Sequence, residues 1–147
     1  MSEPVSGAGA APREPKPRPA PVPDADWAPY WDATLAGRLI VQHCPECGHY
    51  QLYPRAHCLA CRAAVEWVDA SGQGTVHSFT VIRQNPSRSF RHLLPFVVAL
   101  VDLAEGPRLM TNLVDCDPAE VRIGAAVQVR FEPVSDTAAL PLFELVR

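Results

Sequence analysis

The sequence CPECGHYQLYPRAHCLAC, residues 44–61, holds two Cys-x-x-Cys pairs that are separated by 10 residues. Each pair can aim two sulfurs at one point, and four thiolates at about 2.3 Å form the tetrahedral shell that zinc prefers. Two disulfides or four free thiols are the alternatives, but adjacent Cys-x-x-Cys pairs in a chain without an export signal favour a metal. The stretch therefore predicts a structural zinc ion bound by Cys44, Cys47, Cys58 and Cys61.

Three histidines, His43, His49 and His57, flank the cysteines and could replace one of them as a ligand. Four sulfurs already complete the shell, so we expect the histidines to lie outside it. A closed shell has no open coordination position, which a catalytic zinc requires. We place the zinc ribbon at residues 38–66, where the ion is expected to supply about 10–16 kcal/mol of folding energy rather than chemistry.

Length and charge narrow the classes of protein that this chain can represent. Its 147 residues suit one domain with appendages, and the net charge of −3 argues against a protein that binds the phosphates of nucleic acids. The first 26 residues lack the apolar core of a signal peptide. No apolar run approaches the ~20 residues that a membrane-spanning helix needs. We expect a cytoplasmic protein without a membrane segment.

Residues 1–26 are expected to form a disordered tail. They hold 7 of the 16 prolines of the chain, with alanine, glycine and glutamate between them. Such a composition cannot bury a core and cannot form regular backbone hydrogen bonds. A proline-rich interaction peptide is the alternative interpretation.

Large apolar side chains then recur at the spacing of one helical face, which predicts a helix over residues 27–37. Asp26 is a candidate N-cap, and Gly37 is a candidate stop. A helix of this length is not stable alone in water, so its apolar face must dock on another surface. That surface can belong to its own domain or to a partner protein. The candidate partner interface consists of Trp27, Tyr30, Trp31 and Leu35.

Beyond the ribbon, the pattern changes to the period of two residues that indicates β-strands. Alternating or continuous apolar segments occupy residues 75–83, 96–103, 108–114, 127–131 and 142–146. The break between the third and fourth segments contains Asp117 and Pro118, which can cap a short helical turn. Five strands with this break predict a small Greek-key barrel, the OB-fold, over residues 67–147. The predicted fold is therefore mainly β, with an N-terminal helix, a rubredoxin-like zinc ribbon and a five-stranded barrel.

Several short motifs in a fixed order resemble those of the acyl-CoA-associated zinc-ribbon and OB-fold proteins, catalogued as domain of unknown function 35. The resemblance covers about residues 27–147 and leaves the tail unexplained. Besides the two Cys-x-x-Cys pairs, the motifs include Tyr30-Trp31, Gly37-Arg38-Leu39, Tyr53-Pro54-Arg55, Pro95-Phe96, Glu105-Gly106-Pro107-Arg108 and Thr111-Asn112-Leu113.

The resemblance implies an accessory subunit. Proteins of this family accompany thiolase-superfamily enzymes, including sterol-carrier-type thiolases and the aldolases of steroid side-chain degradation. The aldolase members promote retro-aldol cleavage of a β-hydroxyacyl-CoA, with the catalytic groups on the partner and the small subunit helping to form the acyl-CoA site. Other members accompany, or are fused to, hotdog-fold enoyl-CoA hydratases. By analogy we expect a thiolase-like partner in a heterotetramer, with a hydratase partner as the alternative.

The residues themselves offer no complete active site. Cys116 lies outside the ribbon and has no neighbouring base, so a buried structural thiol is the simpler interpretation. His77 falls within a strand and His92 within a loop, and neither has a predicted partner. The sequence contains no phosphate loop, dinucleotide fingerprint or nucleophile elbow. We therefore expect any catalysis to require a partner.

The loop of residues 83–94 is the candidate contact with acyl-CoA or with the partner. It contains Arg83, Arg88, Arg91 and His92 and no acidic residue. Guanidinium groups bind phosphate with bidentate geometry, and coenzyme A is rich in phosphate. The loop between the first two strands of an OB-fold often serves binding. Coenzyme A phosphates, an acidic face of the partner and bulk solvent remain the three alternatives for its environment.

A single-stranded nucleic-acid module is a second function class for a zinc ribbon beside an OB-fold. Such a module needs a basic groove with stacking aromatic side chains. Residues 27–147 carry 10 arginine and lysine residues against 12 aspartate and glutamate residues, and the positive cluster is confined to one loop. We therefore place nucleic-acid binding behind the accessory-subunit hypothesis.

Overall fold

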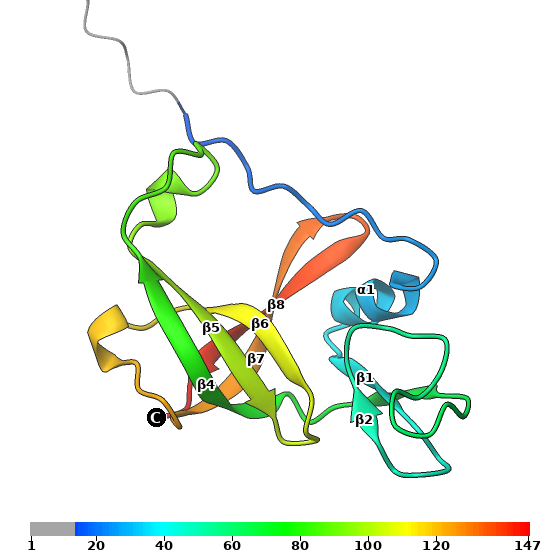
Figure 1. The fold of residues 1–147 in the computed structure, drawn as a ribbon. Coiled ribbons are helices and arrows are strands. Elements are labelled where there is room, and N and C mark those ends of the chain that lie inside the picture. Colours follow the sequence, from blue (N-terminus) through cyan, green and yellow to red (C-terminus); the bar gives the residue numbers. More distant parts are fainter. Residues whose placement is uncertain (1–13) are drawn as a thin grey trace, which may run out of the picture.

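The computed structural model describes residues 14–147 and shows a barrel beside a small ribbon, with helix α1 (Ala28–Leu35) between them (Figure 1). The ribbon comprises β1 (Ile40–His43), β2 (Tyr50–Gln51) and β3 (Glu66–Asp69). The barrel comprises β4 (Gln73–Ile82), β5 (Phe96–Leu103), β6 (Arg108–Leu113), β7 (Ala126–Ser135) and β8 (Ala138–Leu145). The predicted mainly-β fold with a helix, a ribbon and a five-stranded barrel is confirmed.

The barrel closes in the strand order β4-β5-β6-β8-β7, because β4 pairs with β5 on one side and with β7 on the other. All of its pairs are antiparallel except β6 and β8, which meet in parallel at Leu113 and Phe143. Every second residue of β5 points into the core, and Val97, Ala99 and Val101 are at most 1% exposed. This order and alternation are those of an OB-fold.

The ribbon is a three-stranded sheet of order β2-β1-β3. β3 pairs with β1 along its whole length, and the predicted boundary between residues 66 and 67 falls inside it. No strand is predicted here, because the segment is four residues long and begins and ends with an acidic residue. Trp67 packs against the core near Tyr30 of α1, with ring centroids 6.5 Å apart.

Helix α1 packs on β8 and β1 through residues that the aromatic spacing did not identify. Ala33 and Thr34 are buried beside Tyr30, and Thr34 Oγ1 accepts a hydrogen bond from the Ala139 N–H of β8 at 3.4 Å. Trp27 and Trp31 are half-buried, and Leu35 is 42% exposed. Tyr30 thus belongs to the core of this chain, while the two tryptophans lie at its edge.

Local hydrogen bonds explain where α1 begins and where it ends. The predicted N-cap, Asp26, is wrong, because Asp24 Oδ1 accepts hydrogen bonds from the N–H groups of Asp26 and Trp27 at 3.1 and 3.0 Å. At the other end, Gly37 takes a left-handed φ of 73°. Its N–H donates to the Thr34 carbonyl at 3.0 Å, and the Arg38 N–H donates to the Ala33 carbonyl at 2.9 Å. This paired pattern is the Schellman motif, and the predicted stop at Gly37 is confirmed.

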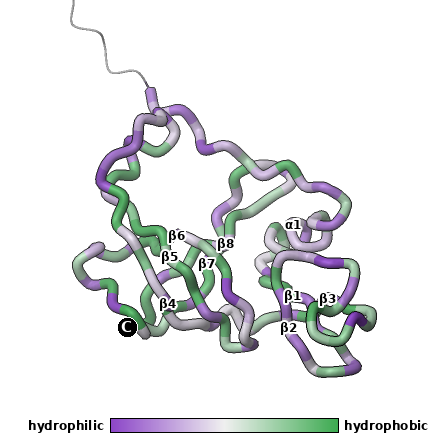
Figure 2. Tube along the Cα trace, in the orientation of Figure 1, coloured by the Kyte–Doolittle hydropathy of each residue, from purple (hydrophilic) through white to green (hydrophobic). Residues whose placement is uncertain are grey.

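The described part of the proline-rich segment, residues 14–26, contains no helix or strand and runs along the barrel to α1 (Figure 1). Arg88 Nη2 donates to the Glu14 carbonyl at 3.1 Å, and Arg18 forms an ion pair with Glu132 of β7. Figure 2 shows hydrophilic residues along this segment and hydrophobic residues along the barrel strands. The disorder predicted for residues 1–13 lies outside the described residues. No helix of residues 14–147 is long and apolar enough to cross a membrane.

Candidate functional site

The four cysteines of the ribbon come together as their spacing predicts. Their four Sγ atoms all lie within 4.8 Å of one another. The Sγ atoms of Cys44 and Cys61 are 3.5 Å apart, and those of Cys47 and Cys58 are 3.6 Å apart. A tetrahedron with metal–sulfur bonds of about 2.3 Å has edges of about 3.8 Å, so this spacing fits one bound ion. Among the described residues the cluster contains cysteines only, without the flanking histidines.

Backbone N–H groups favour ionised sulfurs within this cluster. Desolvation raises the pKa of the Cys58 thiol, but the N–H groups of Cys61 and Ala60 and the neighbouring thiols lower it to about 6. At Cys47, the His49 N–H favours the thiolate, whereas contacts with the other three thiols raise the pKa to about 12. The four sulfurs cannot all ionise together unless a cation compensates their charge, so the donor set suits a divalent metal ion.

The two knuckles that carry the cysteines are built alike. The Gly48 N–H donates to the Cys44 carbonyl at 2.8 Å, and the Arg62 N–H donates to the Cys58 carbonyl at 2.9 Å. Both residues have a left-handed backbone, with φ of 75° at Gly48 and 66° at Arg62. Glycine adopts this conformation freely, but the Cβ of an arginine crowds the backbone there. The second knuckle therefore carries strain that the first does not.

Two buried glutamines, which the sequence analysis missed, hold the chain between the knuckles. Gln42 of β1 and Gln51 of β2 are 6% and 4% exposed, and Gln51 Nε2 donates to Gln42 Oε1 at 2.9 Å. Gln42 Oε1 also accepts from the Arg55 N–H, and Gln51 Oε1 accepts from the Leu59 N–H, both at 2.9 Å. These bonds fix the loop of residues 52–57 and the second knuckle relative to the ribbon sheet.

That loop forms one wall of a groove of about 310 Å³, whose other walls are α1 and the facing parts of β6 and β8. The rings of Trp27 and Tyr53 meet edge to face with centroids 5.9 Å apart. Tyr53 is 48% exposed and has a left-handed φ of 60°. No charged side chain lines the groove within the described part of the chain. Of the four candidate interface residues, the groove is lined by Trp27, Tyr30 and Trp31, but not by Leu35.

The positively charged candidates lie on one exposed loop at the rim of the barrel. Arg83, Arg88, Arg91 and His92 are all exposed, and none of them forms an ion pair within residues 14–147. Arg91 Nη2 donates to the Pro86 carbonyl at 3.0 Å, which curls the loop on itself. The loop borders a second pocket of about 280 Å³, lined by Phe90, Phe96 and Cys116 among others.

Cys116 lines that second pocket and packs against the core. Burial raises the pKa of its thiol, and the Glu120 carboxylate nearby adds to the rise. The thiol is therefore protonated at neutral pH and is not prepared as a nucleophile. Asp117 accepts a hydrogen bond from the Ala119 N–H at 2.8 Å, which confirms its predicted role as the cap of a short helical turn.

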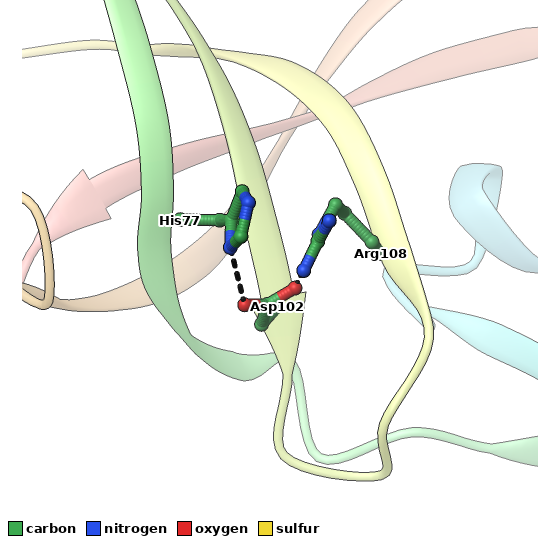
Figure 3. Close-up of polar contacts among 3 residues, drawn as sticks. All are labelled: His77, Asp102 and Arg108. Atoms are coloured by element: carbon green, nitrogen blue, oxygen red, sulfur yellow. Dashed lines mark hydrogen bonds and ion pairs between the residues drawn. The ribbon is translucent and has the colours of Figure 1, made fainter.

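An unpredicted polar cluster lies on the outer face of the barrel (Figure 3). Asp102 of β5 accepts a hydrogen bond from Arg108 Nε at 2.6 Å, and its other oxygen lies 3.1 Å from His77 Nδ1. Arg108, followed by His77, lowers the pKa of the Asp102 carboxyl. Arg108 lies directly opposite Asp102 in the β5–β6 pair, so the two form a cross-strand ion pair, and His77 contacts the second oxygen of Asp102. It contains no nucleophile.

Two family models match adjoining parts of the chain: the ChsH2 rubredoxin-like zinc ribbon domain at residues 31–66 and the ChsH2 C-terminal OB-fold domain at residues 67–132. A DUF35 domain-containing scaffold protein from Methanothermobacter thermautotrophicus is 38% identical over 100 residues, which cover 67% of this chain and 74% of that protein. A probable enoyl-CoA hydratase alpha subunit from Thermomonospora curvata is 36% identical over 120 residues, which cover 80% of this chain but 37% of that protein.

A solved structure described as Ltp2-ChsH2(DUF35) aldolase has the same architecture. One of its chains matches with a TM-score of 0.77 and 34% identity, over 86% of this chain and 98% of that chain. The two family models together extend from residue 31 to residue 132 without a gap. The chain therefore belongs to the DUF35 family, as a zinc-ribbon and OB-fold protein of the ChsH2 type.

Proposed function

We propose that this chain is a non-catalytic accessory subunit of a thiolase-superfamily enzyme that acts on acyl-CoA. The likeness to a chain of the Ltp2-ChsH2(DUF35) aldolase, at 34% identity and over 86% of this chain, is the observation that carries the proposal. Within residues 14–147 the four-thiolate centre leaves no coordination position for a substrate, and no nucleophile is paired with a base. The chemistry then falls to the partner, and retro-aldol cleavage of a β-hydroxyacyl-CoA is the reaction that we assign to the complex.

Zinc is the metal that we assign to the ribbon. Four thiolates at tetrahedral spacing suit this ion, which has no redox chemistry and no geometric preference of its own. Its task in the proposal is to hold the two knuckles, and through them the loop of residues 52–57, in a fixed place beside α1.

The groove between α1, this loop and the barrel is the surface that we assign to the partner. Trp27, Trp31 and Tyr53 present aromatic rings there, and Met110, which also lines the groove, is 65% exposed. Clusters of aromatic side chains around an apolar groove are typical of the residues that dominate protein–protein affinity. Leu35, which does not line the groove, would contribute to the interface only at its margin.

The loop of residues 83–94, which we call the arginine loop, is assigned to the acyl-CoA site that the two proteins share. Arg83, Arg88 and Arg91 have no carboxylate partner within residues 14–147, so their guanidinium groups are available to coenzyme A phosphates or to an acidic face of the partner. His92 is exposed on the same loop, next to Arg91.

Co-purification with a thiolase-like protein from the same organism tests the proposal. We expect a heterotetramer, and Trp31→Ala should weaken it by about tenfold or more, as an aromatic anchor does. Leu59→Ala is the matched control, because Leu59 is 65% exposed on the second knuckle and lies outside the groove. Wild-type chain that remains monomeric beside every such thiolase-like protein would overturn the proposal.

A hydratase partner is the second candidate, because a relative that covers 80% of this chain is named as a probable enoyl-CoA hydratase alpha subunit. The chain spans 37% of that protein, so the hydratase chemistry can reside in the part that has no counterpart here. Assaying the assembled complex for both hydration of an enoyl-CoA and cleavage of a β-hydroxyacyl-CoA distinguishes the two.

A further inference from the structure

The strand β6 has a continuous neighbour on one side only. It pairs with β5 from Arg108 to Leu113, but it meets β8 only at Leu113 and Phe143. Beyond that point, Pro141 of β8 stands in the way of a second ladder, because proline has no N–H to donate. The Pro141 carbonyl instead accepts a hydrogen bond from the Thr111 hydroxyl at 2.8 Å. The barrel therefore opens between β6 and β8 along residues 108–112, and this opening is the floor of the apolar groove.

The hydrogen bonds at the two ends of β6 show which of its backbone groups face the opening. The Pro107 carbonyl accepts from the Leu103 N–H of β5 at 2.9 Å, whereas the Val114 N–H donates to the Phe143 carbonyl of β8 at 2.8 Å. Along a strand, the backbone N–H and C=O groups of every second residue point to the same edge. In β6, the backbone groups of the odd-numbered residues therefore face β5, and those of the even-numbered residues face the opening. Met110 therefore presents its N–H and C=O groups to the groove. No hydrogen bond found among residues 14–147 uses either group.

The surroundings of this free edge are apolar and uncharged. Trp27, Tyr53 and Leu140 stand around it, and the Met110 side chain is 65% exposed. The only charge on the edge itself, Arg108, is already paired with Asp102 (Figure 3). An unpaired strand edge is a template for another strand, and flanking apolar pockets select its alternate side chains.

We propose that the edge of β6 at residues 108–112 receives an extended apolar segment of the catalytic partner as an additional strand. This inference rests on the proposed function and specifies how the partner binds. A second copy of this chain suits the edge less well, because its own α1 and Tyr53 flank its β6 in the same way and would meet those of the first copy. A nucleic acid would find no free positive charge on the groove.

Residue-resolved hydrogen exchange on the full chain, free and bound to the purified thiolase-like protein, tests the added strand. In the free chain the Met110 amide should exchange fast, while the neighbouring amides of Leu109 and Thr111, which face β5, are protected. In the complex the Met110 amide should become protected by about tenfold or more, as a newly formed hydrogen bond requires.

Two substitutions of Met110 distinguish the contribution of its backbone N–H to partner binding from that of its side chain. Met110→Pro removes the N–H at an open edge, where proline is tolerated, and should weaken partner binding by about tenfold or more. Met110→Ala keeps the N–H and should weaken binding by no more than about threefold, the part due to lost apolar contact. The melting temperature and metal content of both variants report whether the chain remains folded.

Each other outcome has a distinct meaning. A complex that forms while Met110 stays unprotected, and that tolerates Met110→Pro, overturns the added strand and leaves the proposed function standing. Absence of any complex overturns the proposed function and the inference with it. Protection of the Met110 amide in the free chain overturns the inference as well. If the free chain is a monomer, another part of the same chain covers the edge of β6; if it is a dimer, a second copy covers it.

Discussion

Arg62 holds a backbone conformation that costs an arginine about 1–2 kcal/mol relative to glycine, which stands at the matching position of the first knuckle. We predict that Arg62→Gly raises the free energy of unfolding by about 0.5–1 kcal/mol, because the relieved strain exceeds the extra entropy that glycine loses on folding. Gly48→Ala is the matched reciprocal and should lower it by about 1 kcal/mol, although open space surrounds the added Cβ. Denaturant unfolding of the metal-loaded protein measures both, and destabilisation by Arg62→Gly would contradict the strain.

The Asp102 carboxyl should report its neighbours in a pH titration. Its pKa is lowered chiefly by Arg108, so the pair stabilises the fold above the ordinary pKa of 3.8 and this contribution is lost as the pH falls through the lowered value. Arg108→Ala should raise the pKa of Asp102 back toward 3.8, and His77→Gln should raise it less. Carbon NMR of the carboxyl group follows the titration, and an unchanged pKa in Arg108→Ala would contradict the pairing in Figure 3.

Individual residues were predictable from the sequence where the cause is local. The cysteine spacing, the cap at Asp117 and the stop at Gly37 each depend on neighbours within a few positions. The Asp102–Arg108–His77 cluster depends on strand register across β4, β5 and β6, which composition and periodicity do not reveal. The buried glutamines were missed for a similar reason, because an inward-facing polar residue is stable only if remote backbone groups satisfy it.

The proposed zinc ion should be required for the fold of the ribbon. Cys44→Ser should abolish stoichiometric zinc binding and unfold residues 38–62, since a structural zinc contributes about 10–16 kcal/mol. The barrel should stay folded, because its five strands pair with one another and not with the ribbon sheet. Elemental analysis and hydrogen exchange measure both effects. Cys116→Ser is the control and should keep one zinc ion per chain; full zinc content in Cys44→Ser would contradict the centre.

The arginine loop offers a kinetic test of the acyl-CoA assignment. In the assembled complex, Arg88→Ala and Arg91→Ala should each raise the KM for acyl-CoA by about tenfold, the worth of one charge-assisted hydrogen bond. Arg122→Ala is the control, because Arg122 is exposed and lies outside the loop. If assembly is intact and the KM of both loop variants is unchanged, the loop does not contact coenzyme A, and an acidic face of the partner becomes the remaining assignment.

Strands were predicted well where alternation was long and poorly where pairing alone defines them. β5 begins and ends where its apolar run does, because each inward residue contributes to the barrel core. β7 and β8 are longer than their apolar segments, since their hairpin arm continues by mutual backbone pairing past Pro133 and Pro141. The groove could not be foreseen, because it depends on three elements that meet only in the folded chain.

One hydrophobic cluster runs from α1 and β1 into the barrel, so helix, ribbon and barrel form a single packed unit. Glu105 of the β5–β6 turn adds a polar tie, since its Oε1 accepts a hydrogen bond from the Ser71 N–H in the connection to the ribbon at 2.6 Å. The groove and the arginine loop are therefore held in a fixed relation by the same core. That fixed relation is what an accessory subunit needs in order to dock on a partner and reach its substrate site at once.

Retro-aldol cleavage of a β-hydroxyacyl-CoA, measured with the chain alone, with the thiolase-like partner alone and with both, tests the accessory role most directly. We predict no cleavage by the chain, little by the partner, and a rate that rises with added chain until each partner subunit has one. Cleavage by the chain alone, or a partner rate that does not respond to the chain, would contradict it.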